Sequence, residues 1–130
     1  MLLACPLTQA LADVQEGKPV ITGDAVLDTS LQGINRRFHN KTRDLIAALS
    51  RQYMFPPNSI DKLVSNQDFA PADVFLIVAL ADLSGQPLAT VSHAYLEHRA
   101  AGWAYVLEQL DIDVSSSDFE QLVEDADLYD

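Results

Sequence analysis

Apolar residues recur at helical spacing in short segments that proline, glycine and asparagine separate. The most regular stripe lies in residues 103–110, where apolar side chains occupy positions i, i+3, i+4 and i+7 of one face. This stripe and others like it, together with their flanking breakers, predict helices over residues 28–38, 40–55, 57–66, 71–84, 87–101, 103–110 and 117–124. The pattern is typical of a chain built from many short amphipathic helices.

Residues 71–84 differ from the other segments because the run from Val74 to Ala81 is apolar on nearly every side. A helix of this kind must be covered by neighbours over most of its surface. A buried parallel strand can show the same run. However, Pro71 marks a helix start and Gly85 a helix stop, and no other segment alternates like a strand partner. We therefore expect an all-α single domain of about six short helices packed around a central apolar helix at 71–84.

Polar residues that can accept a hydrogen bond from free backbone N–H groups precede several of these helices. Asp28 or Thr29 can cap the first helix, and Asn40 can cap the second. Ser117 and Glu120 have the spacing of a capping box at the start of the last helix. The predicted parts of the chain are a secretion-signal remnant at residues 1–12, an extended lead-in at 13–27, a helical domain at 28–124 and a fraying acidic tail at 125–130.

Residues 1–12 admit three interpretations. Ala10 and Ala12 have the A-x-A spacing that precedes signal-peptidase cleavage, Cys5 ends a lipoprotein-like box, and the whole stretch can instead be the first helix of a cytosolic fold. We favour cleavage after Ala12, because Pro6 directly follows the cysteine and suits a lipidated residue poorly. The basic start of such a signal is missing, which we attribute to a coding start placed too far downstream. We therefore expect an exported, most simply periplasmic, protein, with lipoprotein and cytoplasmic locations as alternatives.

Composition and charge restrict the classes of partner. The chain has 130 residues, 48% of them hydrophobic, and one cysteine, so it is large enough to fold as one domain and cannot form an internal disulfide. Its net charge is −11, divided into +1 over residues 1–62 and −12 over residues 63–130. Such a field repels phosphates and anionic headgroups, so we exclude nucleic acid and membrane-surface partners. No apolar run reaches the roughly 20 residues of a membrane span.

The basic side chains of the first half gather in one short stretch. Arg36, Arg37, Lys41 and Arg43 form a patch that can dock an acidic partner, including the acidic half of a second copy in a homo-oligomer. The alternative is that the patch lies against the chain's own acidic helices or in water. Trp103 can line a groove for a ligand or partner, but its helical spacing with apolar neighbours favours the core.

Candidate metal ligands occur in two places. His93 and Glu97 lie four residues apart on one predicted helix face, although no third ligand is visible. Asp111 and Asp113 begin a stretch that resembles the first half of a calcium loop, but Ser116 stands where the sharp turn requires glycine. An ordinary turn before the last helix explains that stretch better. Because neither place makes a complete site and no catalytic motif is present, we expect no cofactor and no enzymatic activity.

The order of motifs in the second half carries a resemblance. The sequence has Ala-Pro-Ala-Asp-Val-Phe at 70–75, Ser-Gly-Gln-Pro at 84–87, Gly-Trp at 102–103, Leu-Asp-Ile at 110–112 and Asp-Phe-Glu-Gln-Leu at 118–122. This order resembles a group of small exported bacterial proteins with the pattern P-A-D-V, G-x-P, G-W, L-x-I and F-x-x-L. The resemblance implies a helical fold and a secretion signal, and it supplies no catalytic residues. The chain departs from the pattern at residues 99–102, where those proteins have a basic glycine-rich turn, and at Glu120, where they have histidine.

These observations predict a non-catalytic exported protein that acts as an interaction or structural module, with a protein partner of unknown identity. The alternative is a small-ligand or cation-binding periplasmic protein that uses the acidic C-terminal half.

Overall fold

The computed structural model describes residues 20–65 and 68–130, in which the chain forms seven helices and no strand. The helices are α2 (Ala25–Arg37), α3 (Thr42–Tyr53), α4 (Pro57–Val64), α5 (Pro71–Ser84), α6 (Leu88–Glu97), α7 (Gly102–Gln109) and α8 (Ser117–Tyr129). The predicted all-α single-domain class is therefore confirmed. The predicted secretion remnant at residues 1–12 and the first part of the lead-in lie outside the described residues.

Helix α5 begins and ends where the sequence predicts. Pro71 occupies its first turn, and the Asp73 carboxylate accepts a hydrogen bond from the backbone N–H of Ala70 at 3.1 Å. Gly85 ends the helix in the left-handed conformation, with φ of 70°, which glycine adopts at little cost. Every residue from Ala72 to Ala81 is buried, as the apolar composition of this helix requires.

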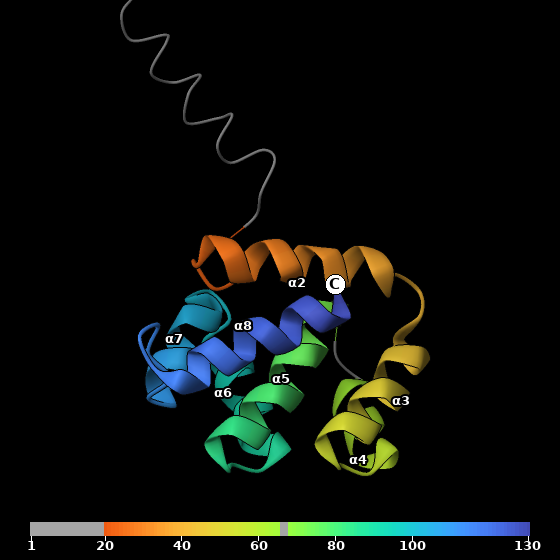
Figure 1. Cartoon of the computed structure of the whole chain (residues 1–130). Coiled ribbons are helices and arrows are strands. Elements are labelled where there is room, and N and C mark those ends of the chain that lie inside the picture. The colour runs from red at the N-terminus through yellow and green to blue at the C-terminus, as the bar shows by residue number, and fades with distance from the viewer. Residues whose placement is uncertain (1–19, 66–67) are drawn as a thin grey trace, which may run out of the picture.

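Not all of the other helices pack mainly against α5. Helix α2 lies along α8 across one face of the domain, and the two run in the same direction (Figure 1). Helix α5 packs against α2, α3, α6 and α8. In contrast, α4 packs on α3 and α6, and α7 packs on α6, rather than primarily on α5. Thus α5 is the most buried helix but not the common packing partner of all the others.

Helix α2 begins earlier than predicted, within the expected lead-in at 13–27. Asp24 caps it, because its carboxylate accepts a hydrogen bond from the N–H of Leu27 at 2.9 Å. The predicted caps Asp28 and Thr29 lie inside the first two turns instead. Two aspartates four residues apart can each serve as a cap. The Asp28 carboxylate instead accepts hydrogen bonds from the residues before the helix, so Asp24 is the cap.

Two further caps were assigned to the wrong residue. Asn40 has a left-handed backbone, with φ of 60°, and lies one residue before Lys41, the N-cap of α3, which makes no side-chain cap hydrogen bond. The predicted capping box at Ser117 is wrong by one position, because the side chain of Ser116 accepts from the N–H of Phe119 at 3.1 Å.

The predicted fraying tail at 125–130 is instead the last part of α8. Both Asp125 and Tyr129 are buried there, and the helix continues to Tyr129. Gly33 of α2 faces this end of α8, since a β-carbon added at Gly33 would collide with the Asp130 side chain. The glycine that weakens α2 as a helix former thereby lets the two helices approach closely.

Candidate functional site

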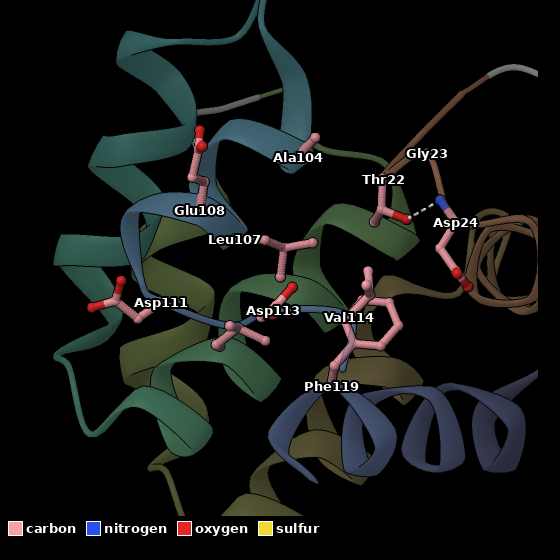
Figure 2. Close-up of a pocket in the computed structure, with 11 residues that line it drawn as sticks. Thr22, Gly23, Asp24, Ala104, Leu107, Glu108, Asp111, Asp113, Val114 and Phe119 are labelled. Carbon is pink, nitrogen blue, oxygen red and sulfur yellow. Dashed lines mark hydrogen bonds between the residues drawn. The ribbon is translucent and has the colours of Figure 1, made fainter. Parts of the chain in front are cut away.

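An open cavity of about 650 Å³ lies where the start of α2, helix α7 and the connection between α7 and α8 meet (Figure 2). It is lined by Thr22, Gly23, Asp24, Ala104, Leu107, Glu108, Asp111, Ile112, Asp113, Val114 and Phe119. Residues 22–24 are thus brought beside a connection that lies far away in the sequence. This arrangement makes the cavity the first candidate for a binding site.

One rim of the cavity is held by the carboxylate of Asp28, which is only 8% exposed. Its Oδ1 accepts hydrogen bonds from the backbone N–H and the hydroxyl of Thr22, at 2.8 and 2.6 Å. Its Oδ2 accepts from the N–H groups of Ile21 and Gly23, both at 3.1 Å. Because four donors converge on one buried carboxylate, the segment before α2 has a fixed path over the domain.

Two further carboxylates face the cavity. Asp24 uses one oxygen to cap α2, and its own N–H donates to the Thr22 hydroxyl at 3.2 Å. Asp113, in the α7–α8 connection, accepts from the Ser115 hydroxyl at 2.8 Å. Both side chains are therefore held in place by local hydrogen bonds.

The floor between these two carboxylates is apolar. Leu107, Ile112 and Phe119 are buried beneath it, while Val114 is largely exposed at its edge. The connection turns sharply at Asp111, whose φ is 59°, and the N–H of Ile112 then donates to the carbonyl of Leu107 at 3.0 Å. This turn directs the residues after α7 back under the start of α2.

Charge in the lining has one sign. Among the residues that the structure describes, the lining contains the carboxylates of Asp24, Glu108, Asp111 and Asp113 and no lysine, arginine or histidine. In Figure 2, Asp24 and Asp113 lie on either side of the space above Val114 and Phe119, whereas Glu108 and Asp111 project away from it. The inner charge of the cavity therefore belongs to the first pair. Such a cavity favours a cationic group over an anionic one.

The four weak metal candidates form no common site. His93 Nε2 and Glu97 Oε2 lie 3.1 Å apart, so the expected pair on one helix face exists, with both side chains exposed. Asp113 is engaged with Ser115, and the next residue, Ser116, caps α8, which is the arrangement of an ordinary turn. Across residues 20–65 and 68–130, no three side chains of histidine, cysteine, aspartate or glutamate come together as a metal-binding group.

The basic patch lies around the end of α2 and the start of α3. Arg36, Arg37, Lys41 and Arg43 are all exposed. Arg37 is partly engaged within the fold, because its Nη1 donates to the carbonyl of Tyr129 at 3.1 Å. The contact places one member of the patch against the C-terminal end of acidic α8, as the second interpretation of this patch expects.

Trp103 is a core residue, and its buried ring also contributes to the lining of a second cavity, of about 460 Å³. It is 1% exposed, and its Nε1 donates to Asp73 Oδ1 at 2.8 Å. Its ring stacks on Tyr95 with the centroids 4.1 Å apart. Burial, followed by the nearby Asp73 charge, raises the pKa of Tyr95. The burial of Trp103 supports the core interpretation, and its role in binding a ligand or partner stays a prediction.

A buried polar network between α3 and α8 was not predicted. Tyr53 donates to Asp125 Oδ2 at 2.7 Å, and Gln121 Nε2 donates to Asp125 Oδ1 at 2.9 Å. Tyr129 donates to Gln52 Oε1 at 2.8 Å. Burial and the bond to Asp125 raise the pKa of Tyr53. Only the helical spacing of Gln121 and Asp125 was visible in the sequence, since the contact to α3 spans 72 positions.

None of the helices in the described part of the chain combines the length and the apolar character that crossing a bilayer requires. The resemblance carried by residues 70–122 stays a prediction. No protein-family model, no curated protein and no solved structure matches the chain.

Proposed function

We propose that the protein is a non-catalytic interaction module that binds a lysine or arginine side chain of a partner protein in the cavity between α2 and α7. The observation that carries this proposal is the pair of carboxylates, Asp24 and Asp113, on either side of an apolar floor in a cavity that no basic residue of the described ranges lines.

The shape of the lining suits a long basic side chain. Lysine and arginine have aliphatic stems that pack on apolar surfaces while their charged heads remain near water or carboxylates. Phe119 and Leu107 offer the apolar surface, and the two aspartates offer acceptors above it. An acidic or purely apolar side chain would desolvate both carboxylates without supplying a positive charge, which is unfavourable.

The charge of the whole chain acts in the same direction. A net charge of −11, with −12 in residues 63–130, attracts a basic partner before contact and raises the rate of encounter. Because these forces act through solvent, binding is expected to weaken as ionic strength rises.

The test uses a short fluorescent peptide of alternating lysine and alanine, with a glutamate–alanine peptide as the control. In the double variant Asp24→Asn/Asp113→Asn, asparagine still caps α2 and still accepts from Ser115. The substitutions therefore remove the two charges and keep the local hydrogen bonds. The matched control Glu124→Gln/Asp127→Asn removes the same charge from the exposed face of α8. We expect the lysine peptide to lose about tenfold in affinity with the first variant and less than about twofold with the second.

Other outcomes decide against this function. Equal losses of affinity in both double variants would mean that the binding of the peptide depends only on the net charge of the protein. Stabilisation by butylamine or calcium, measured as a rise in Tm, without binding of the lysine peptide would favour the alternative small-ligand or cation-binding function. Binding of neither class would remove the cavity as a site.

Export is a second part of the proposal and rests on residues 1–12 alone. The A-x-A spacing predicts a mature chain that starts at Asp13, and the test is the intact mass of the protein produced in its own host. A mass that includes Met1 would contradict export, and a lipid on Cys5 would favour the lipoprotein alternative.

A further inference from the structure

Met54 is an unusual residue for the end of a helix. It follows α3 in the left-handed conformation, with φ of 62°, and its side chain is 84% exposed. Glycine or asparagine is usual at such a position, because a β-carbon there costs of the order of 1 kcal/mol. A large apolar side chain in this place contributes neither burial nor a favourable backbone to the fold. Such a departure points to a use outside the fold.

The surroundings hold this conformation in place. The N–H of Met54 donates to the carbonyl of Ser50 at 3.0 Å, and the Ser50 hydroxyl donates to the carbonyl of Phe55 at 2.5 Å. Pro56 and Pro57 follow directly and open α4. The methionine is therefore presented on a rigid corner rather than on a loose loop.

An apolar groove of about 460 Å³ adjoins this corner, between α4 and the start of α6. Its lining consists of Phe55, Ser59, Lys62, Leu63, Leu88 and Ala89. Phe55, the residue after Met54, is half-buried in it, as is Leu63. Methionine beside an open apolar groove is a common arrangement at protein-binding surfaces, because its flexible thioether adapts to different side chains.

Charge around the groove is the reverse of that in the cavity. Lys62 is the only charged residue in its lining within the part of the chain that the structure describes. The basic patch of Arg36, Arg37, Lys41 and Arg43 lies around the end of α2 and the start of α3 and is not part of this lining. An acidic group of an occupant can therefore pair with Lys62, whereas a basic group would meet a like charge there.

We propose that the groove and Met54 form a second docking surface, which takes a bulky apolar side chain from an acidic amphipathic helix of a partner protein. The anchor would lie on Phe55 and Leu63, and an acidic residue of that helix would face Lys62. This surface is separate from the cavity of the proposed function and has the opposite charge preference, so either can exist without the other.

The test uses two synthetic amphipathic helices that share one leucine stripe and carry either glutamate or lysine on the polar face. The chain has only two methionines, Met1 and Met54, so methyl-labelled methionine reports on this corner nearly alone. We expect the glutamate peptide to shift the Met54 methyl resonance and the lysine peptide to leave it unchanged. Lys62→Glu should reverse this preference.

Met54→Gly removes the side chain while offering the residue that the backbone prefers, so folding is not at risk. We expect it to weaken the glutamate peptide at least about fivefold, which corresponds to about 1 kcal/mol, without lowering Tm. The control is Val26→Ser, which removes an exposed apolar side chain from α2 and should leave binding unchanged.

Three results would overturn the proposal: no shift with either peptide, equal shifts with both, or a Met54 shift that follows protein concentration alone. The last would assign the groove to a second copy of the chain. Asp24→Asn/Asp113→Asn should leave the glutamate peptide unaffected. A failure at the cavity and a failure at the groove are therefore distinguished by different peptides and different variants.

Discussion

Two aspartates of the acidic half behave in opposite ways. Asp125, 6% exposed, accepts hydrogen bonds from Tyr53 and Gln121 and joins α8 to α3. Asp113 is exposed at the cavity, and its hydrogen bond to Ser115 is local. Both residues count equally toward the net charge, yet one stabilises the packing of two helices and the other is available to a ligand. Charge alone therefore cannot separate structural carboxylates from binding ones.

The C-terminal end of α8 is anchored by more than Asp125. The hydroxyl of Tyr129 donates to Gln52 Oε1, and its ring lies 5.5 Å from that of Phe75. Its carbonyl accepts from Arg37 of α2. This end of the chain thus contacts three other helices, which explains why it does not fray.

The largest effect is expected from deleting residues 125–130. The deletion removes the buried side chains of Asp125, Ala126 and Tyr129 together, and we expect it to cost more than about 3 kcal/mol in the free energy of unfolding. Urea denaturation measures the loss. As a control, Leu128→Ser changes an exposed position of the same segment and should have little effect. An unchanged midpoint in the deletion would restore the interpretation of this segment as a tail.

Tyr53→Phe tests the hydrogen bond across the α3–α8 interface. The substitution keeps the ring in place but leaves Asp125 Oδ2 without its donor in a buried site, which costs about 1–3 kcal/mol. Thermal and urea unfolding should both show this loss at neutral pH. Tyr105→Phe, at a partly exposed position of α7, is the matched control. Equal effects of the two substitutions would contradict a special role of the network.

The same network should make stability depend on alkaline pH. Burial raises the pKa of both Tyr53 and Tyr129 in the folded state, so the folded protein retains protons that the unfolded chain releases above about pH 10. The contribution is fully present below that pH and is lost as pH rises further. Unfolding free energies measured between neutral pH and the alkaline range should therefore fall, and less steeply in Tyr53→Phe. A slope that this substitution leaves unchanged would place the alkaline transition elsewhere.

A smaller effect is expected at the start of α8. Ser116→Ala removes the side chain that accepts from Phe119, and loss of such a cap costs about 1 kcal/mol. Ser117→Ala changes the residue that the sequence pattern favoured and should cost much less. If the second substitution proved more damaging, the capping box expected from the sequence would be right.

How far the sequence predicts this molecule depends on how local each signal is. Helix α5 was predicted between its correct ends because Pro71 and Gly85 act through their own backbone. The start of α2 was missed because Asp24 and Asp28 are both good caps. The two residues differ only in that the Asp28 carboxylate accepts hydrogen bonds from residues 21–23. Local backbone preferences can be predicted from the sequence. Which of two equally suitable N-cap residues is used, in contrast, depends on tertiary contacts.

The candidate site follows the same rule. Asp111 and Asp113 were singled out as a pair because they are close in sequence, and the structure instead sets Asp113 opposite Asp24. The partner of Asp125 was equally invisible, because Tyr53 lies on another helix. For the exposed corner at Met54, the only indication in the sequence is the pair Pro56 and Pro57, which predicts that the helix ends there. In each case, which side chains come together depends on how distant segments pack.

The smallest effect on stability is expected from Asp113→Asn. Asparagine keeps an acceptor for the Ser115 hydroxyl and loses only the charge, so the free energy of unfolding should change by less than about 0.5 kcal/mol. Asp125→Asn is the paired experiment. The same change of residue type in the buried site should cost about 1–3 kcal/mol. Tyr53 and Gln121 donate to different oxygens of Asp125, and an amide offers only one oxygen as an acceptor. Urea unfolding of the two variants at one ionic strength compares them directly. If Asp113→Asn proved as damaging as Asp125→Asn, Asp113 would be a structural carboxylate, and the cavity would lose one of the two charges on which the proposed binding function depends.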